Sequence, residues 1–178
     1  MSPTTQTTTT QAVAARLADG SWRLDPARSS VAFHVRHFYG LMTVKGHFDR
    51  YDGTLDLQGT QPVVTLTIEA DSLDTKHKQR DKHLRSKDFF DVEHHPQVRF
   101  VSDGAGVNGD VLQVHGHLHA AGKSIPLELD ARITETDAGP RIEATTTADH
   151  RELGMTWSPL GILRPPSTLI VRGRLIPA

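Results

Sequence analysis

Three histidines alternate along one short stretch and form the most obvious potential metal site of the chain. His115, His117 and His119 occupy every second position of "VHGHLHA". Side chains two residues apart point to the same face of a strand, and imidazole is a common ligand of zinc, copper and nickel. Gly116 and Leu118 continue the apolar face, however, so the histidines are expected to face solvent. We expect no bound metal, and a metal-dependent small-molecule enzyme built on these histidines stays as an alternative.

A second group of chemically active residues lies in "RDKHLRSKDFFDVEHHP", residues 80–96. Six of the twelve residues from 76 to 87 are Lys or Arg, and one is acidic. Such a charge run is explained either by a solvated helix face or by a basic rim that meets an anionic head group. For the second role, the head-group residues would be Arg80, His83 and Arg85, with Lys87 as the weakest assignment.

Other enzyme classes and nucleic-acid binding have little support. The chain contains neither G-x-S-x-G nor H-E-x-x-H, so we predict no catalytic residues and no cofactor. Lys and Arg number 20 against 21 Asp and Glu, whereas a dedicated nucleic-acid binder carries a clear basic excess. There are no cysteines, which excludes a disulfide scaffold. No apolar run has the length of a membrane-spanning helix.

The first 20 residues differ in composition from the rest. They are rich in Thr and lack the basic region and apolar core of a secretory signal, so we expect a disordered tail and a cytoplasmic protein. The remainder, residues 21–178, is long enough to form one domain with a proper core.

The elements that must position these residues are strands. Apolar and polar residues alternate in "SSVAFHVRH", "PVVTLTIEA", "VLQVHGHLHA", "SIPLELDARIT", "RIEATTTAD" and "STLIVRGRLI". Such strands belong to antiparallel sheets with one buried face. Turn signals occur at Asp52-Gly53, Gly122 and Gly139. The pattern predicts an all-β fold, either a sandwich or an up-and-down barrel.

Small residues interrupt the apolar face of these strands. They are Gly46, Gly116, Ala120, Ala131, Ala144, Thr146, Ala148 and Gly173. An eight-stranded barrel can be filled by its own side chains or can hold one small ligand. Small residues among Phe, Leu and Ile favour an elongated apolar cavity, and the alternative is that the glycines are bulges that let the sheet close.

One segment breaks the alternation and predicts a helix over about residues 76–86, with Asp74 or Thr75 as its N-cap. With few apolar residues it cannot form a core, so we expect it to cap one end of the barrel. Leu84, Phe89 and Phe90 would anchor it. Asp88 and Asp91 are expected to cap turns or to pair with arginines and fasten the cap.

The same segment carries a family resemblance. "SLDT" followed by "RDKHLRSKDFFDVEHHPQVRF" resembles the signature of the YceI-like family. The likeness continues in four further segments. The family's opening strands are resembled by "WRLDPARSSVAFHVRH", its next hairpin by "VKGHFDRYDGTLDL", its later hairpin by "VHGHLHAAGKSIPLEL" and its late Arg–Gly element by "DHRELGM". The resemblance therefore spans residues 22–177. It implies an eight-stranded antiparallel lipocalin-like barrel, a homodimer, and a long apolar pocket that binds polyisoprenoids. No catalytic residues are implied.

We therefore predict a protein that binds and sequesters or carries a long-chain amphiphile, such as a polyprenyl diphosphate or an isoprenoid quinone. The predicted ligand-binding residues are Phe33, Val35, Phe48, Leu66, Ile68, Leu84, Phe89, Phe90, Phe100, Leu118, Leu129, Met155 and Trp157. The partners expected are this hydrophobic ligand, a second copy of the chain and a transient membrane surface, but no nucleic acid. Residues 154–167 are interpreted as a lip at the pocket mouth or as a dimer contact. A filled-barrel structural or stress protein is a further alternative.

Overall fold

The computed structural model describes residue 17 and residues 20–58, 61–161 and 163–178. The predicted tail, residues 1–20, falls almost entirely outside the described residues, and its disorder stays a prediction. None of the described helices has the length and hydropathy needed to span a bilayer.

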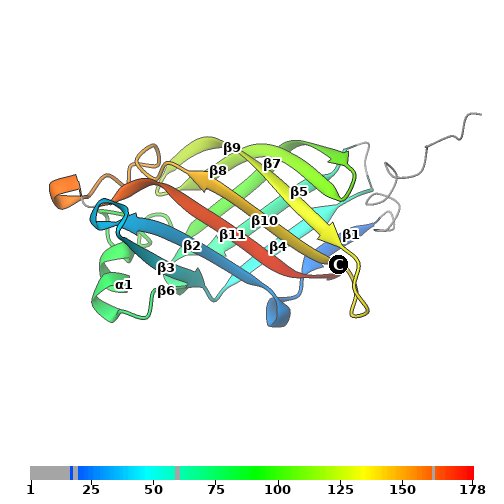
Figure 1. Ribbon diagram of the computed structural model, residues 1–178, viewed down its shortest axis with the longest axis horizontal. Coiled ribbons are helices and arrows are strands. Elements are labelled where there is room, and N and C mark those ends of the chain that lie inside the picture. The colour runs from blue at the N-terminus through cyan, green and yellow to red at the C-terminus, as the bar shows by residue number, and fades with distance from the viewer. Residues whose placement is uncertain (1–16, 18–19, 59–60, 162) are drawn as a thin grey trace, which may run out of the picture.

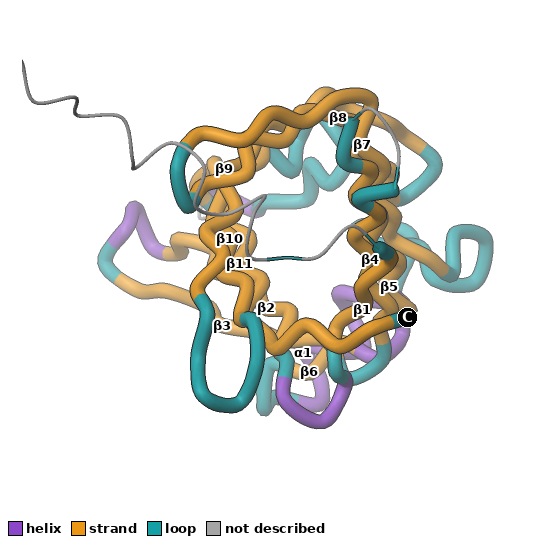
Figure 2. The backbone as a smooth tube through the Cα atoms, turned by 90° about the vertical axis from the view of Figure 1, so that its right-hand side faces the viewer, coloured by secondary structure: helices purple, strands orange, loops and turns teal. Residues whose placement is uncertain are grey.

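Eight strands form a closed antiparallel ring around one axis (Figure 1; Figure 2). In ring order they are β1 (Ser21–Leu24), β4 (Tyr51–Asp56), β5 (Val63–Glu69), β7 (Gln97–Asn108), β8 (Val111–Ala120), β9 (Lys123–Thr134), β10 (Arg141–Ala148) and β11 (Arg164–Pro177). The ring closes because the end of β11 pairs with β1, with Leu175 opposite Leu24. The predicted eight-stranded antiparallel barrel is confirmed.

Three further strands extend the wall at one end. The first part of β11 pairs with β2 (Ser30–His37), which pairs with β3 (Met42–Phe48), which meets the short β6 (Leu73–Asp74). The helix α1 (Lys78–Arg85) lies at the same end (Figure 1). The short 3-10 helices are η1 (Pro26–Arg28), η2 (Phe38–Gly40), η3 (Ala70–Ser72) and η4 (Pro159–Gly161). The predicted combination of a barrel and one short capping α-helix is therefore present among the described residues.

Alternation along the strands sends one face inward, most clearly in β8 and β9. In β8 every second residue from Leu112 to Ala120 is buried, whereas Gln113 and the three histidines are exposed. The same period holds in β9, where Ile125 and Leu127 are buried. The apolar pattern in the sequence therefore sets which side chains face the barrel interior.

The turn expected at Asp52-Gly53 was wrong. Both residues lie inside β4, and the chain turns earlier, at Asp49–Arg50. The Leu24 side chain packs against Gly53, so an added Cβ would be 2.6 Å from Leu24 Cδ1. The strands β3 and β4 also do not pair with each other, so "VKGHFDRYDGTLDL" does not form the expected hairpin.

The helix is shorter than predicted and has a different N-cap. Lys76 has a φ of 62°, in the left-handed region, so the chain cannot be helical there. The helix begins at Lys78, and the Nδ1 atom of the N-cap His77 accepts a hydrogen bond from the backbone N–H of Arg80 at 3.2 Å. The predicted caps, Asp74 and Thr75, precede this turn.

Hydrogen bonds hold the cap on the barrel, but not through the predicted Arg–carboxylate pairs. Arg85 donates to the backbone carbonyls of Asp71 and Leu73 at 2.8 and 2.6 Å. The buried Asp81 carboxylate accepts from the backbone N–H and hydroxyl of Thr75 at 2.9 and 2.5 Å. The carboxylates Asp88 and Asp91 instead contact His83 and His94, at 3.0 and 2.9 Å.

A cavity accounts for the small inward alanines and the threonine, whereas Gly46, Gly116 and Gly173 form no bulge in their own strands. Gly116 lies opposite a bulge in β7 between Ser102 and Gly104, and Gly46 lies under the Phe33 ring. An added Cβ at Gly116 would be 2.2 Å from the Val101 carbonyl oxygen. The alanines and the threonine line a cavity; they are Ala120, Ala131, Ala144, Thr146 and Ala148.

We predict that Gly116→Ala destabilises the protein by about 1–3 kcal/mol, because the new methyl group meets backbone that cannot move aside. Gly106→Ala, in the neighbouring strand β7, is the control, since no atom lies within 4 Å of its added Cβ. Urea unfolding of both variants measures the difference. Equal stabilities would show that the bulge accommodates a side chain.

Candidate ligand-binding cavity

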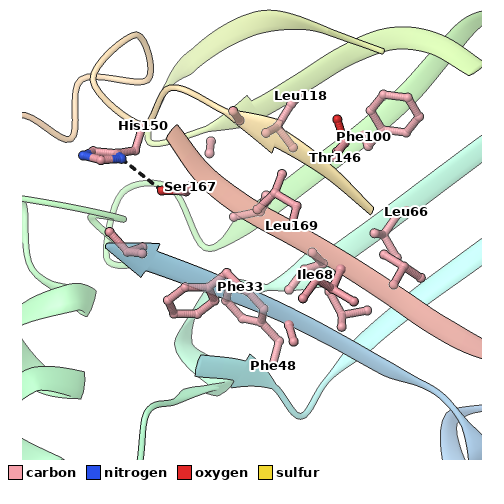
Figure 3. Close-up of a pocket in the computed structure, with 18 of the residues that line it drawn as sticks. Phe33, Phe48, Leu66, Ile68, Phe100, Leu118, Thr146, His150, Ser167 and Leu169 are labelled. Atoms are coloured by element: carbon pink, nitrogen blue, oxygen red, sulfur yellow. Dashed lines mark hydrogen bonds between the residues drawn. The ribbon is translucent and has the colours of Figure 1, made fainter. Parts of the chain in front are cut away.

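The barrel interior contains an elongated apolar cavity of about 760 Å³. It extends from Leu24 and Leu175, near the β1–β11 closure, to Phe38 and Trp157 at the opposite end. Figure 3 shows Phe33, Phe48, Leu66, Ile68, Phe100, Leu118 and Leu169 around this space. Ligand pockets have volumes of roughly 300–1,000 Å³, so the interior has the size of a ligand site, unlike the filled-barrel alternative.

All thirteen predicted ligand-binding residues lie on the cavity wall. They are Phe33, Val35, Phe48, Leu66, Ile68, Leu84, Phe89, Phe90, Phe100, Leu118, Leu129, Met155 and Trp157. Strand alternation directs the strand residues of this set inward. The cap supplies Leu84, Phe89 and Phe90, and the loop before β11 supplies Met155 and Trp157. Phe48 and Phe90 meet edge to face with centroids 5.9 Å apart, which joins the cap to the barrel. Ligand contact by these residues stays a prediction.

The cavity reaches the surface at the end that carries the cap. Apart from Thr54 of β4, the exposed lining residues all belong to this end: Phe38, Met42, Thr43, Lys45, Lys76 and Trp157. We call this opening the mouth. Residues 154–167, which the sequence suggested as a lip, contribute Met155, Trp157, Leu163 and Ser167 to the wall. Their position at the mouth agrees with the lip interpretation.

The charged groups on the wall all have the same sign. Over the described residues, the cavity is lined by Lys45, Lys76 and Arg80 and by no Asp or Glu. Lys76 is paired with Asp74, at 2.6 Å. Arg80 donates to the Thr75 hydroxyl and carbonyl, both at 2.7 Å, and in the described part of the chain it has no ion pair. The guanidinium therefore stands beside an apolar space without a direct carboxylate contact among the described residues, and the Thr75 hydroxyl links it to the buried Asp81.

The remaining predicted head-group residues divide between the wall and the outside. His83 lines the cavity, contacts Asp88 and lies edge-on to the Trp157 ring, with centroids 4.2 Å apart. Arg85 does not line the cavity, because its guanidinium is bound to the Asp71 and Leu73 carbonyls. Lys87 is exposed and also lies off the wall. Part of the basic run therefore attaches the cap to the barrel, and part of it lies at the cavity wall.

A polar pair inside the cavity was missed by the sequence analysis. His150 follows β10, Ser167 lies in β11, and the His150 Nδ1 atom is 3.0 Å from the Ser167 hydroxyl oxygen (Figure 3). Ser167 is buried, and both residues line the cavity. Burial lowers the pKa of His150, although the nearby Asp149 opposes this. Alternation in "STLIVRGRLI" places Ser167 on the inward face, and this is the signal that could have found the pair.

The histidine row faces solvent, as its alternation predicted. His115, His117 and His119 are exposed, and the His117 Nδ1 atom lies 3.2 Å from an Asp103 oxygen. In the part of the chain that is described, the group of three ligand atoms close enough to share a metal is a different one, His47, Asp49 and Asp74. The absence of a bound metal at the histidine row stays a prediction.

The fold and the site together define a class of protein. A closed antiparallel barrel with an apolar interior, one mouth and a few polar groups on its wall is a small-molecule-binding barrel.

Comparison with known families then places the chain within this class. The chain belongs to the YceI-like family, because the model of the YceI-like domain matches residues 22–171. The family has the fold of a binding protein and is not a known enzyme family.

Curated relatives include a UPF0312 protein of Pectobacterium atrosepticum and protein YceI of Escherichia coli O157:H7. Each is 37% identical over 106 residues, which cover 58% of this chain and 55% of the relative. The chain therefore spans about half the length of the curated relatives it matches.

Solved structures show the same fold. Burkholderia cenocepacia BcnA superimposes with a TM-score of 0.77 at 18% identity, covering 86% of this chain and 99% of that one. A polyisoprenoid binding domain from Saccharophagus degradans, implicated in plant cell wall breakdown, gives 0.63 at 15% identity, with coverages of 86% and 97%. At these identities the likeness concerns the fold.

We predict that His150 titrates below the ordinary value of 6.5 and that His94 titrates above it. Burial disfavours the charged imidazole of His150, whereas the Asp91 carboxylate stabilises that of His94. Protonating His150 therefore opposes folding, so its contribution to stability is lost as the pH falls below 6.5. An NMR pH titration of the imidazole signals, assigned with His150→Asn and His94→Asn, measures both. His150 titrating at or above 6.5 would contradict the buried position.

Proposed function

We propose that this chain binds, and sequesters or carries, a long-chain amphiphile with an anionic head group, of the polyisoprenoid diphosphate type. One observation carries the proposal: an elongated apolar cavity opens at a mouth where the described charged groups on the wall are all basic. The apolar interior suits a hydrocarbon tail. The basic mouth suits a negatively charged head.

Burial of the tail would supply most of the affinity. Each methylene moved from water into the cavity contributes about 0.8 kcal/mol, without any directional contact. Aromatic and aliphatic side chains from opposite walls, including Phe33, Phe100 and Leu118, would surround the chain. The protein would therefore select ligands by tail length and width, because the cavity has a fixed volume.

Arg80 is the strongest candidate for the head group. Its hydrogen bonds to Thr75 hold the guanidinium at the wall and leave further N–H donors for a phosphate. Lys45 is exposed at the mouth and lies on the wall as well. Together these groups can neutralise an anion that remains near solvent while its tail is buried.

A second candidate ligand is an isoprenoid quinone, which has a neutral head. The pair of His150 and Ser167 favours it, since a neutral imidazole can donate a hydrogen bond to a ring carbonyl within an apolar wall. In the described structure, the His150 Nε2 atom has no hydrogen-bond partner. The polyisoprenoid binding domain from Saccharophagus degradans supports a prenyl tail in either case.

Several expectations from the sequence remain proposals. These are the homodimer, the cytoplasmic location and the absence of catalytic activity.

We predict that native mass spectrometry of freshly purified protein shows one bound lipid per chain, and that organic extraction identifies a prenyl chain. An apo mass that persists after incubation with polyprenyl diphosphates and quinones would overturn the proposed function.

Ala144→Phe should shorten the longest prenyl diphosphate that binds, because Ala144 is buried on the cavity wall halfway along β10. Thr145→Phe is the matched control, since the adjacent side chain is exposed.

We predict that Arg80→Gln weakens binding of a polyprenyl diphosphate by roughly 10- to 100-fold relative to the polyprenol of the same length, since a charged hydrogen bond contributes about 1.5–3 kcal/mol. The ratio of the two dissociation constants isolates the head group from any loosening of the cap. Arg85→Gln is the comparison: it should lower thermal stability and leave that ratio unchanged, because Arg85 lies off the cavity wall and donates to two backbone carbonyls. An unchanged ratio for Arg80→Gln would remove Arg80 from the head-group site.

A further inference from the structure

Exposed apolar side chains gather on two loops beside the mouth. We call residues 38–42, which run from the end of β2 to the first residue of β3, and residues 157–160, before β11, the mouth loops. Leu41 and Leu160 are 88% and 86% exposed, and the others are Phe38, Tyr39, Met42 and Trp157. In Figure 1 these are the blue loop after β2 and the orange turn, which project from the left-hand end. An exposed apolar patch of this kind marks an interaction surface.

The two mouth loops form one unit and are continuous with the cavity. The Tyr39 hydroxyl donates to the Leu160 carbonyl at 3.3 Å, and the Arg164 guanidinium lies over the Tyr39 ring at 5.1 Å from its centroid. Phe38, Met42 and Trp157 are exposed and also line the cavity. A partner bound to the mouth loops would therefore be in direct contact with the cavity opening.

The charge of the surrounding sequence identifies the kind of partner. Residues 26–48 and 153–178, which carry the mouth loops, contain no Asp or Glu, although the whole chain has a net charge of −1. The charged neighbours in these segments, Arg36, Lys45 and Arg164, are exposed. Apolar side chains flanked by basic ones suit the surface of a bilayer that contains anionic lipid. Tyr and Trp are the aromatic residues that favour the interfacial region of a bilayer.

We propose that the mouth loops dock on an anionic membrane surface, with Leu41 and Leu160 inserted among the lipids and the cavity mouth facing the bilayer. The inference builds on the proposed function, because docking lets an amphiphile pass between the bilayer and the cavity without crossing water. A second copy of the chain is the competing partner. A symmetric dimer through this face would bring the basic residues Arg36, Lys45 and Arg164 of two copies close together, and this repulsion disfavours it.

The test is co-sedimentation with vesicles made of equal parts phosphatidylcholine and phosphatidylglycerol. The wild-type chain should sediment with them, and less with phosphatidylcholine alone or at raised salt. The double substitution Leu41→Asp with Leu160→Asp should lower the partition coefficient by about tenfold or more, since two apolar insertions are lost. Quenching of Trp157 fluorescence by brominated acyl chains, absent in Trp157→Phe, reports insertion of the mouth loops themselves.

The matched control is Val63→Asp with Val107→Asp, which places the same charges on two exposed valines away from the mouth loops. It should keep wild-type vesicle binding, and circular dichroism should show all variants folded. Delivery of a polyprenyl diphosphate from detergent micelles tests the cavity separately, and both double variants should bind it normally.

Failure of the two proposals can be distinguished. Ligand binding from micelles without binding to anionic vesicles would overturn docking and leave the proposed function standing. Vesicle binding without ligand binding would overturn the proposed function and leave docking standing. A wild-type dimer in sedimentation velocity that Leu41→Asp with Leu160→Asp converts to a monomer would make the mouth loops an interface between copies and would also overturn docking.

Discussion

β11 pairs with β10 along one edge and with two different strands along the other, and this second pairing is the constraint on which the rest of the structure depends. Its last residues pair with β1 and close the ring, whereas its first part pairs with β2. Closure removes the free sheet edges of the ring and forces the apolar face of every ring strand inward. Because β2 pairs with the first part of β11 and β3 pairs with β2, the wall extends at one end, and the mouth is formed there. The cavity, the cap and the mouth loops all follow from this arrangement.

The barrel encloses a space that its own side chains do not fill. Bulky residues such as Phe33 and Phe100 project from the wall, and alanines at 131 and 144 face each other across β9 and β10. Side chains that face an empty space lack the dispersion contacts they would make in a close-packed core, so an unfilled interior lowers the stability of the fold. A bound tail would recover these contacts. Binding of the proposed ligand would therefore be coupled to packing, since a bound tail would complete the core.

The cap shows how a highly charged segment can close an apolar barrel. Its buried carboxylate, Asp81, is compensated by two hydrogen bonds from Thr75, and Arg85 is bound to two backbone carbonyls. These contacts use part of the basic run for attachment. Arg80 also contacts Thr75 but keeps its charge at the cavity wall without an acidic partner among the described residues. The same short segment therefore fixes the cap and supplies the charge at the mouth.

The sequence by itself determined which side chains enter the barrel, because a period of two allows only one inward face per strand; Phe100, Leu118 and Leu129 were found in this way. It did not determine contacts between segments distant along the chain. The His150–Ser167 pair joins a loop to a strand 17 residues away, and Arg85 reaches carbonyls 12 and 14 residues earlier. Gly53 resembles a turn residue locally and instead lies inside β4, where the Leu24 side chain of another strand packs against it. Only the closed tertiary structure decides such contacts, because they depend on which strands become neighbours.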